Sequence, residues 1–275
     1  MFGRYLNRWN LVPDGEAIHT HSSDLLPVQF EGKPAMLKVA RSDEEATGNN
    51  LMVWLNGRGA AHVYAQGGEA IVLERLHSEP SLTEMVNTGQ DNEATRILCR
   101  AAAELHAVSR LEHTPPPPLP DLRRWFRSLE RTAALGGVYA TAWSIAQELL
   151  NDPQDTTALH GDLHHGNVLH SPARGWLLID PKGLVGERGF DYANIFYNPT
   201  NADALRPGRL TRQLEIVCAE SGLERARLLR WVAAYGGLSA AWWLEDDQHG
   251  DDQYSEARKV LNIVELALAA LSVSG

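Results

Sequence analysis

The sequence predicts an α+β protein with two lobes, a small β-rich lobe followed by a mainly helical one. Up to about Leu76, short strand-like segments alternate with turn residues around a single helical segment. Beyond that residue, apolar side chains recur at spacings of three and four, the period of helices that bury one face. We therefore expect one lobe at 1–76 and the other at 77–275. A chain of 275 residues with 44% hydrophobic content is long enough to bury a sizeable core.

Each expected element of the N-terminal lobe has its own local signal. The segment RSDEEATGNNLMVWL has helix-start chemistry, because Ser42 or Asp43 can cap the first turn and acids follow. Gly48 weakens this helix. Lys38 shares a strand face with Met36 by the period of two. Strands are expected at 17–21, 25–30 and 34–40, and a hairpin at 60–66 and 70–76 around Gly67 and Gly68.

The C-terminal lobe is expected to be helical, with one exception at its centre. Two short apolar runs, 168–170 and 175–180, are split by the turn SPAR, which favours a small hairpin. The tract Pro115–Pro120 is interpreted as a stiff connector, with a ligand for an SH3-type domain as the alternative. Helices are expected at 91–109, 122–135, 141–151, 224–244 and 257–271.

The composition argues against several classes of function. Cys99 and Cys218 are the two cysteines and form no CxxC pair, so we expect reduced thiols. A net charge of -10 without a basic stripe argues against a nucleic-acid partner and favours a cationic small molecule. With no signal-peptide core and no run of 18 apolar residues, we expect a cytoplasmic protein with no membrane partner.

The stretch LHGDLHHGNVLH, residues 159–170, carries four histidines, one aspartate and one asparagine. One interpretation is a zinc site, since His160 and His164 have helical i, i+4 spacing. However, Gly161 and Gly166 disfavour a helix here, and the glutamate of an HExxH motif is missing. A polar loop without chemistry is a second interpretation.

The segment that follows favours a third interpretation, phosphoryl transfer. This reaction needs a carboxylate near the acceptor hydroxyl and oxygen ligands that hold magnesium against the phosphates. Protein kinases place the catalytic Asp and a metal-binding Asn five positions apart, and a second metal-binding Asp after the next strand. Asp162 and Asn167 have this spacing, and Asp180 ends the next strand-like run. Lys38, followed by Glu45 on the next helix with Glu44 as the alternative partner, matches the upstream ion pair of the same template.

These motifs resemble the aminoglycoside phosphotransferase family, which are small-molecule kinases with a bilobal protein-kinase-like fold. The segments LLIDPKGLVGERGFDYANIFYNP, VWLNGRGAA and AYGGLSAAW are similar to its streptomycin 6-phosphotransferase branch, sometimes grouped with hydroxyurea phosphotransferases, over roughly 16–243. The resemblance implies resistance by O-phosphorylation of an aminoglycoside such as streptomycin, with Mg²⁺ and ATP, or GTP as another donor. Kinases of hydroxyurea or another hydroxylated metabolite, and a non-catalytic nucleotide-binding regulatory module, are the alternatives.

The resemblance also implies a role for individual residues. Asp162 would be the general base, and Asn167 and Asp180 the magnesium ligands. Lys38 would contact phosphates while Glu45 holds it. Support of the catalytic loop is expected from His160 and Asp191, and further nucleotide contacts from Ser22, Ser23, Glu74 and Leu76.

Two features beside the expected reaction centre bear on the acceptor. Gly166 and Lys182 depart from the branch's usual residues, which affects substrate identity more than reaction type. The acidic run Glu245–Gln253 follows the segment AYGGLSAAWW and could receive a cationic sugar through Glu245, Asp246 and Asp247. A solvated acidic loop is the alternative interpretation of this run.

Overall fold

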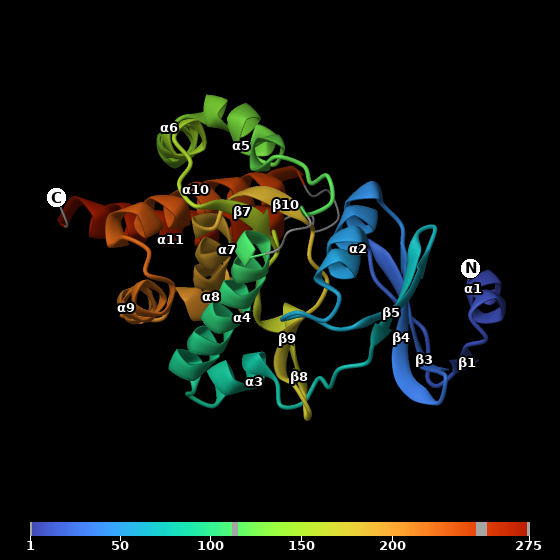
Figure 1. Ribbon diagram of the computed structural model, residues 1–275. Helices are drawn as coiled ribbons and strands as arrows, with labels where there is room; N and C mark the ends of the chain where they lie inside the picture. The colour runs from blue at the N-terminus through green and yellow to red at the C-terminus, as the bar shows by residue number, and fades with distance from the viewer. Residues whose placement is uncertain (1, 112–114, 246–251, 274–275) are drawn as a thin grey trace.

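In the computed structural model, which describes residues 2–111, 115–245 and 252–273, a β-sheet lobe stands beside a larger helical lobe (Figure 1). The two lobes and the α+β class expected from the sequence are therefore confirmed. In chain order, the last strand of this sheet is β6, which ends at Glu74. The exact lobe boundary at Leu76 stays a prediction.

The sheet of the N-terminal lobe is antiparallel, with the strand order β1-β3-β4-β6-β5 and β2 paired to β3. Because successive side chains of a strand point to opposite faces, the two faces of the sheet pack against different parts of the protein. Leu37 and Val39 lie in the small core beneath α1, whereas Lys38 has Ile71 as its cross-strand partner, in the core that contains α2. The strands are β1 (Val12–Pro13), β2 (Ile18–His19), β3 (Ser23–Phe30), β4 (Lys33–Ala40), β5 (Val63–Gly67) and β6 (Ala70–Glu74).

Helix α2 (Asp43–Leu55) lies between the sheet and the helical lobe (Figure 1). Ser42 is its N-cap, because the Ser42 hydroxyl accepts a hydrogen bond from the Glu45 N–H at 3.3 Å. Gly48, which weakens this helix, allows it to pack closely against the other lobe. A Cβ atom at this position would lie 1.8 Å from the carbonyl oxygen of Pro181. The helix therefore touches the segment of the other lobe that follows Asp180.

The helical lobe is built around α10, whose central residues are buried between α6, α7 and α11. Trp231 of this helix packs edge-on against Phe126 and Phe190. The helices are α3 (Leu82–Asn87), α4 (Asp91–Leu111), α5 (Arg127–Thr132), α6 (Gly137–Asn151), α7 (Gly189–Asn194), α8 (Asn201–Ala204), α9 (Arg209–Ser221), α10 (Arg225–Glu245) and α11 (Asp252–Val273), and α1 (Gly3–Arg8) precedes the sheet.

The helix expected over 122–135 is wrong as a single element. It is divided into a 3₁₀ turn at Leu122–Arg124, helix α5, and a second 3₁₀ turn at Ala133–Leu135. The first interruption coincides with two consecutive aromatic residues that both need packing partners. Trp125 packs against Trp242, and Phe126 is fully buried against Trp231.

Two small antiparallel pairs lie inside the helical lobe. The expected hairpin is present as β8 (Val168–Ser171) and β9 (Gly175–Leu178), and the sequence did not predict the pair β7 (Thr156–Leu159) and β10 (Leu184–Glu187). Residues 160–167 connect β7 to β8, so the histidine-rich stretch is a loop between two strand pairs.

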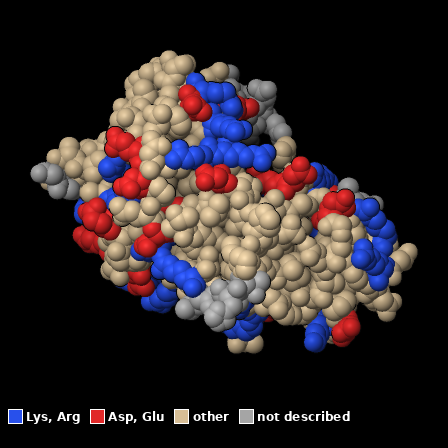
Figure 2. Space-filling model, turned by 45° about the horizontal axis from the view of Figure 1, so that its top comes forward, with Lys and Arg blue, Asp and Glu red and all other residues tan. Residues whose placement is uncertain are grey.

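Over the face shown in Figure 2, basic and acidic side chains lie beside one another. Arg131 and Glu245 form one of the surface ion pairs, with 2.6 Å between nitrogen and oxygen. Within the described ranges, none of the helices has the length and apolar character needed to cross a bilayer.

Candidate active site

Asp191, in the first turn of α7, binds the start of the loop between β7 and β8. Its carboxylate accepts hydrogen bonds from the N–H groups of His160 and Gly161 and from the His106 ring, each at 2.9 Å. Complete burial alone would raise the pKa of Asp191, but the hydrogen bond from His106 and the neighbouring groups outweigh it and lower this pKa. A buried, ionised carboxylate thus fixes the start of the loop.

The imidazole of His160 connects this loop to the strand that leads to Asp180. Its Nε2 lies 2.9 Å from the Ile179 carbonyl oxygen, and its Nδ1 accepts a hydrogen bond from the Asp162 N–H at 3.2 Å. Burial lowers the pKa of His160, so the ring is neutral and Nε2 is the donor. The contacts are those of an orienting residue rather than of a metal ligand.

Asp162 presents its carboxylate at the loop surface, with 36% of the side chain exposed. Three polar groups surround this carboxylate: the Asn194 amide at 3.4 Å, the Asn167 amide at 3.5 Å and the His164 ring at 3.7 Å. The Asn167 amide also donates to the Asp162 backbone oxygen at 2.8 Å. The five-residue spacing therefore folds the loop so that its aspartate and asparagine lie together.

Asn167 and Asp180 lie at the same end of the β8–β9 hairpin. Asn167 immediately precedes β8, and the N–H of Ile179 donates to the Asn167 carbonyl oxygen at 3.0 Å. Asp180 has a left-handed backbone with φ of 58°, a conformation that non-glycine residues adopt mainly at turns and functional sites. Its carboxylate is in contact with the Lys38 ammonium, so a cation already lies against it.

Lys38 of β4 forms ion pairs with both Asp180 and Glu45. Glu45 is fully buried on α2, where it also pairs with Lys182 and accepts a hydrogen bond from the Ser23 hydroxyl at 2.9 Å. Burial opposes ionisation, yet Lys38 and Lys182 lower the pKa of Glu45 to about 2. The expected Lys38–Glu45 pair is present, and Lys182 is a second cation that the sequence analysis did not assign to it.

The other residues expected around the nucleotide lie in or next to strands β3 and β6 of the sheet. The Ser22 carbonyl oxygen accepts a hydrogen bond from the Arg41 N–H at 2.9 Å. The Glu74 side chain accepts one from the His62 N–H at 3.1 Å and is paired with Arg174. Leu76 packs against the main core. These contacts leave the proposed nucleotide roles of Ser22, Ser23, Glu74 and Leu76 as predictions.

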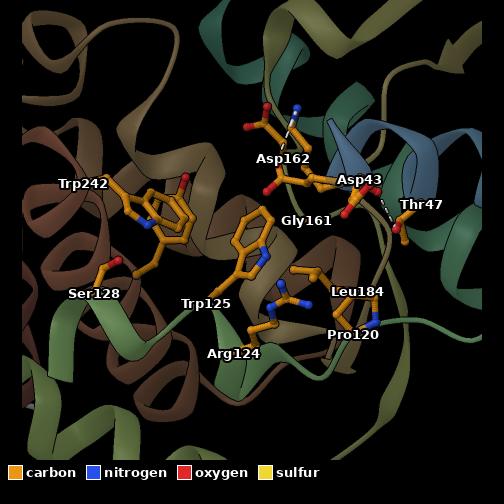
Figure 3. Close-up of a pocket in the computed structure, with 13 residues that line it drawn as sticks. Asp43, Thr47, Pro120, Arg124, Trp125, Ser128, Gly161, Asp162, Leu184 and Trp242 are labelled. Carbon is orange, nitrogen blue, oxygen red and sulfur yellow. Dashed lines mark hydrogen bonds and ion pairs between the residues drawn. The ribbon is translucent and has the colours of Figure 1, made fainter. Parts of the chain in front are cut away.

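Asp162 opens onto a pocket of about 560 Å³ between the lobes. In Figure 3, Trp125 and Trp242 lie on one side of this pocket, with Asp43 and Asp162 across from them. Among the described residues, the Asp43 carboxylate has no ion-pair partner. The lining residues are Asp43, Glu44, Thr47, Pro120, Arg124, Trp125, Ser128, Gly161, Asp162, Lys182, Leu184, Tyr235 and Trp242.

The acidic run expected to bind the acceptor contributes one described residue. Glu245 is already engaged, because it accepts a hydrogen bond from Ser128 at 2.8 Å and pairs with Arg131 at 2.6 Å. Asp246 and Asp247 lie outside the described residues. Asp43 and Glu44, from the other lobe, line the pocket instead.

The histidines of the loop have different surroundings. His165 is 2% exposed, and in the described part of the chain neither of its ring nitrogens has a hydrogen-bond partner. Burial lowers the pKa of His165 to about 3. No three His, Cys, Asp or Glu side chains of the described residues gather as a metal site would need.

The fold is that of the protein-kinase-like small-molecule phosphotransferases. A solved aminoglycoside phosphotransferase, a thermostable mutant of APH(4)-Ia in complex with ADP and hygromycin B, matches with a TM-score of 0.66. The match covers 96% of this chain and 97% of the other, at 14% identity, so the likeness is one of fold.

Sequence comparison identifies the family within this class. The family model for aminoglycoside/hydroxyurea antibiotic resistance kinases matches residues 8–247. The chain is 50% identical over 246 residues to the streptomycin 3''-kinase of Klebsiella pneumoniae, which covers 88% of this chain and 91% of that protein. It is 30% identical over 259 residues to the streptomycin 6-kinase of Streptomyces glaucescens, covering 88% and 81%. The chain belongs to this family of antibiotic-resistance kinases and is a small-molecule kinase acting on hydroxyl groups, as its motifs predicted.

Proposed function

We propose that this protein inactivates streptomycin by transferring the γ-phosphoryl group of ATP to the 3''-hydroxyl. The observation that carries the proposal is the arrangement of Asp162, Asn167 and Asp180 on one loop and hairpin, fixed by the buried groups His160 and Asp191. The 50% identity to a streptomycin 3''-kinase supports the acceptor and its position. Because the 6-kinase relative is only 30% identical, we replace the expected 6-position by the 3''-position.

Asn167 and Asp180 offer amide and carboxylate oxygens, the ligand types that Mg²⁺ prefers beside nucleotide phosphates. The ion pair between the Asp180 carboxylate and the Lys38 ammonium supports this assignment, because a cation lies against the carboxylate. Magnesium at these residues would neutralise charge on the phosphates. Lys38, once released from Asp180, would donate to phosphate oxygens from its position on β4.

Asp162 orients the acceptor hydroxyl and accepts its proton as the hydroxyl oxygen bonds to the γ-phosphorus. The bond between that phosphorus and the bridging oxygen breaks, and ADP leaves with the electron pair. The 36% exposure of the Asp162 side chain gives an acceptor access to the carboxylate. The Asn194 and Asn167 amides contact this carboxylate and would limit its movement.

The acceptor enters the pocket beside Asp162. Carboxylates bind guanidinium groups through paired hydrogen bonds, and indole rings stack on flat cations. Asp43 and Glu44 supply the carboxylates, and Trp125 and Trp242 supply the rings. Streptomycin, whose streptidine ring carries two guanidinium groups, has the charge and shape that such walls would bind.

The test is a panel of acceptors with the purified protein. Streptomycin, hydroxyurea and a neutral sugar are each incubated with Mg²⁺ and either ATP or GTP, and products are analysed by mass spectrometry and phosphorus NMR. We expect one added phosphate on streptomycin, at the 3''-oxygen, and a much slower addition with Asp162→Asn. Phosphate at the 6-oxygen would refute the position, and turnover of hydroxyurea alone would refute the acceptor. Nucleotide binding without transfer to any acceptor would instead support a regulatory module.

A further inference from the structure

Glu45 is shared by two lysines that come from different lobes. Lys38 reaches one carboxylate oxygen from β4, and Lys182 reaches the other from the segment after Asp180. Lys38 has a second partner, Asp180, whereas the ammonium of Lys182 has a weaker contact with Glu44 at 3.7 Å. The two lysines therefore differ in what they do beside holding Glu45.

The backbone of Lys182 is tied to the catalytic loop. Its N–H donates to the carbonyl oxygen of His160 at 2.7 Å, and the N–H of Gly183 donates to the same oxygen at 3.3 Å. Its side chain is 15% exposed and reaches back to α2, which touches Pro181 at Gly48. Lys182 thus connects α2 of the N-terminal lobe directly to the loop that carries Asp162.

The proposed function gives this connection a purpose. When Lys38 moves from Asp180 to the nucleotide phosphates, it stays paired with Glu45 but shares its positive charge with the phosphate oxygens. Glu45 is fully buried, and a buried carboxylate whose charge is incompletely compensated is destabilised. A second cation on the opposite oxygen removes that difficulty.

We propose that Lys182 is a positioning residue that keeps Glu45 paired and α2 docked on the catalytic loop while Lys38 serves the nucleotide. This inference rests on the proposed function for the role of Lys38. In this role Lys182 acts through Glu45, with which its ammonium pairs, although the residue also lines the pocket beside Asp162.

The test measures ATP affinity of the full chain by calorimetry, beside steady-state kinetics with streptomycin. Lys182→Met should weaken ATP binding roughly 5- to 150-fold, the usual range of coupling between two sites, with a smaller change in the streptomycin KM. Lys182→Arg should restore most of the affinity, because it keeps the cation. Lys33→Met, a matched change at the exposed start of β4, should bind ATP as the wild type does.

The double variant Glu45→Gln/Lys182→Met separates the proposed role of Lys182 from a general loss of folded protein. Without the charge on Glu45, Lys182 has no buried carboxylate to compensate, so the double variant should bind ATP as Glu45→Gln alone does. A further loss in the double variant overturns the proposal. So does a Lys182→Met variant that raises the streptomycin KM but binds ATP normally, since Lys182 would then serve the acceptor. ATP affinity is measured without acceptor, so failure to phosphorylate streptomycin would refute the proposed function separately.

Discussion

Gly48→Ala should damage the enzyme even though alanine is the better helix former. The substitution adds about 1 kcal/mol of helix propensity to α2. The new Cβ atom, however, would lie 1.8 Å from the Pro181 carbonyl oxygen, and ordinary van der Waals contact begins at 3.4 Å. Helix and segment must therefore separate by about 1.6 Å, and overpacking of this kind costs roughly 1–3 kcal/mol.

The displacement falls at the junction between Glu45 and Asp180, so it should reduce kcat/KM by about 10²-fold, as misplacements near 1 Å do. The assays are steady-state kinetics with ATP and streptomycin and thermal unfolding. Asn50→Ala is the control, because Asn50 is exposed on the same helix and the change adds propensity without crowding. If Gly48→Ala were as active and as stable as Asn50→Ala, the close contact between α2 and Pro181 would be refuted.

Four further changes test the site. Asp162→Asn cannot accept the hydroxyl proton and should lower kcat by about 10²- to 10⁴-fold in steady-state assays, with a modest change in streptomycin KM; full turnover would exclude it as the base. Lys38→Met should reduce turnover while thermal unfolding shows an intact fold, and unchanged kinetics would remove Lys38 from the site. Asp43→Asn with Glu44→Gln should raise the streptomycin KM, less so at high salt, whereas equal KM values would place acceptor recognition elsewhere. Burial holds the pKa of His165 near 3, so the unfolded chain takes up its proton first as pH falls below about 6.5, and this side chain should cost about 2 kcal/mol of stability by pH 5. Denaturant unfolding of His165→Leu should lose less stability between pH 7 and pH 5 than the wild type, and equal losses would contradict the low pKa.

The parts of the site that the sequence predicted depend on short-range order. Asp162 and Asn167 are five residues apart, so one loop conformation is enough to bring the amide within 2.8 Å of the Asp162 backbone oxygen. The N-cap at Ser42 depends on one turn of helix. Asp191 lies further along the chain, and its carboxylate has the loop contacts that the family resemblance implied.

The parts that escaped prediction depend on contacts between distant segments. From the sequence, Gly48 only lowers the helix propensity of its segment. Its packing role depends on the contact with Pro181, which is distant in the sequence. From the sequence, Lys182 is only a departure from the family pattern. The structure shows that it pairs with Glu45, which also pairs with Lys38. Periodicity also favoured one helix over 122–135, because it carries no information about the different partners that Trp125 and Phe126 need.

Helix α2 links the two substrates of the proposed reaction. Glu45 holds Lys38 on the nucleotide side, and Asp43 and Glu44, one turn away or less, line the pocket beside Asp162. A shift of this helix therefore changes the surroundings of both substrates, and coupling between two binding sites is reciprocal. If ATP draws α2 toward the catalytic loop, it also brings Asp43 toward Trp125 across the pocket. ATP should then tighten streptomycin binding by the same factor by which streptomycin tightens ATP binding, and Gly48→Ala should weaken both effects together.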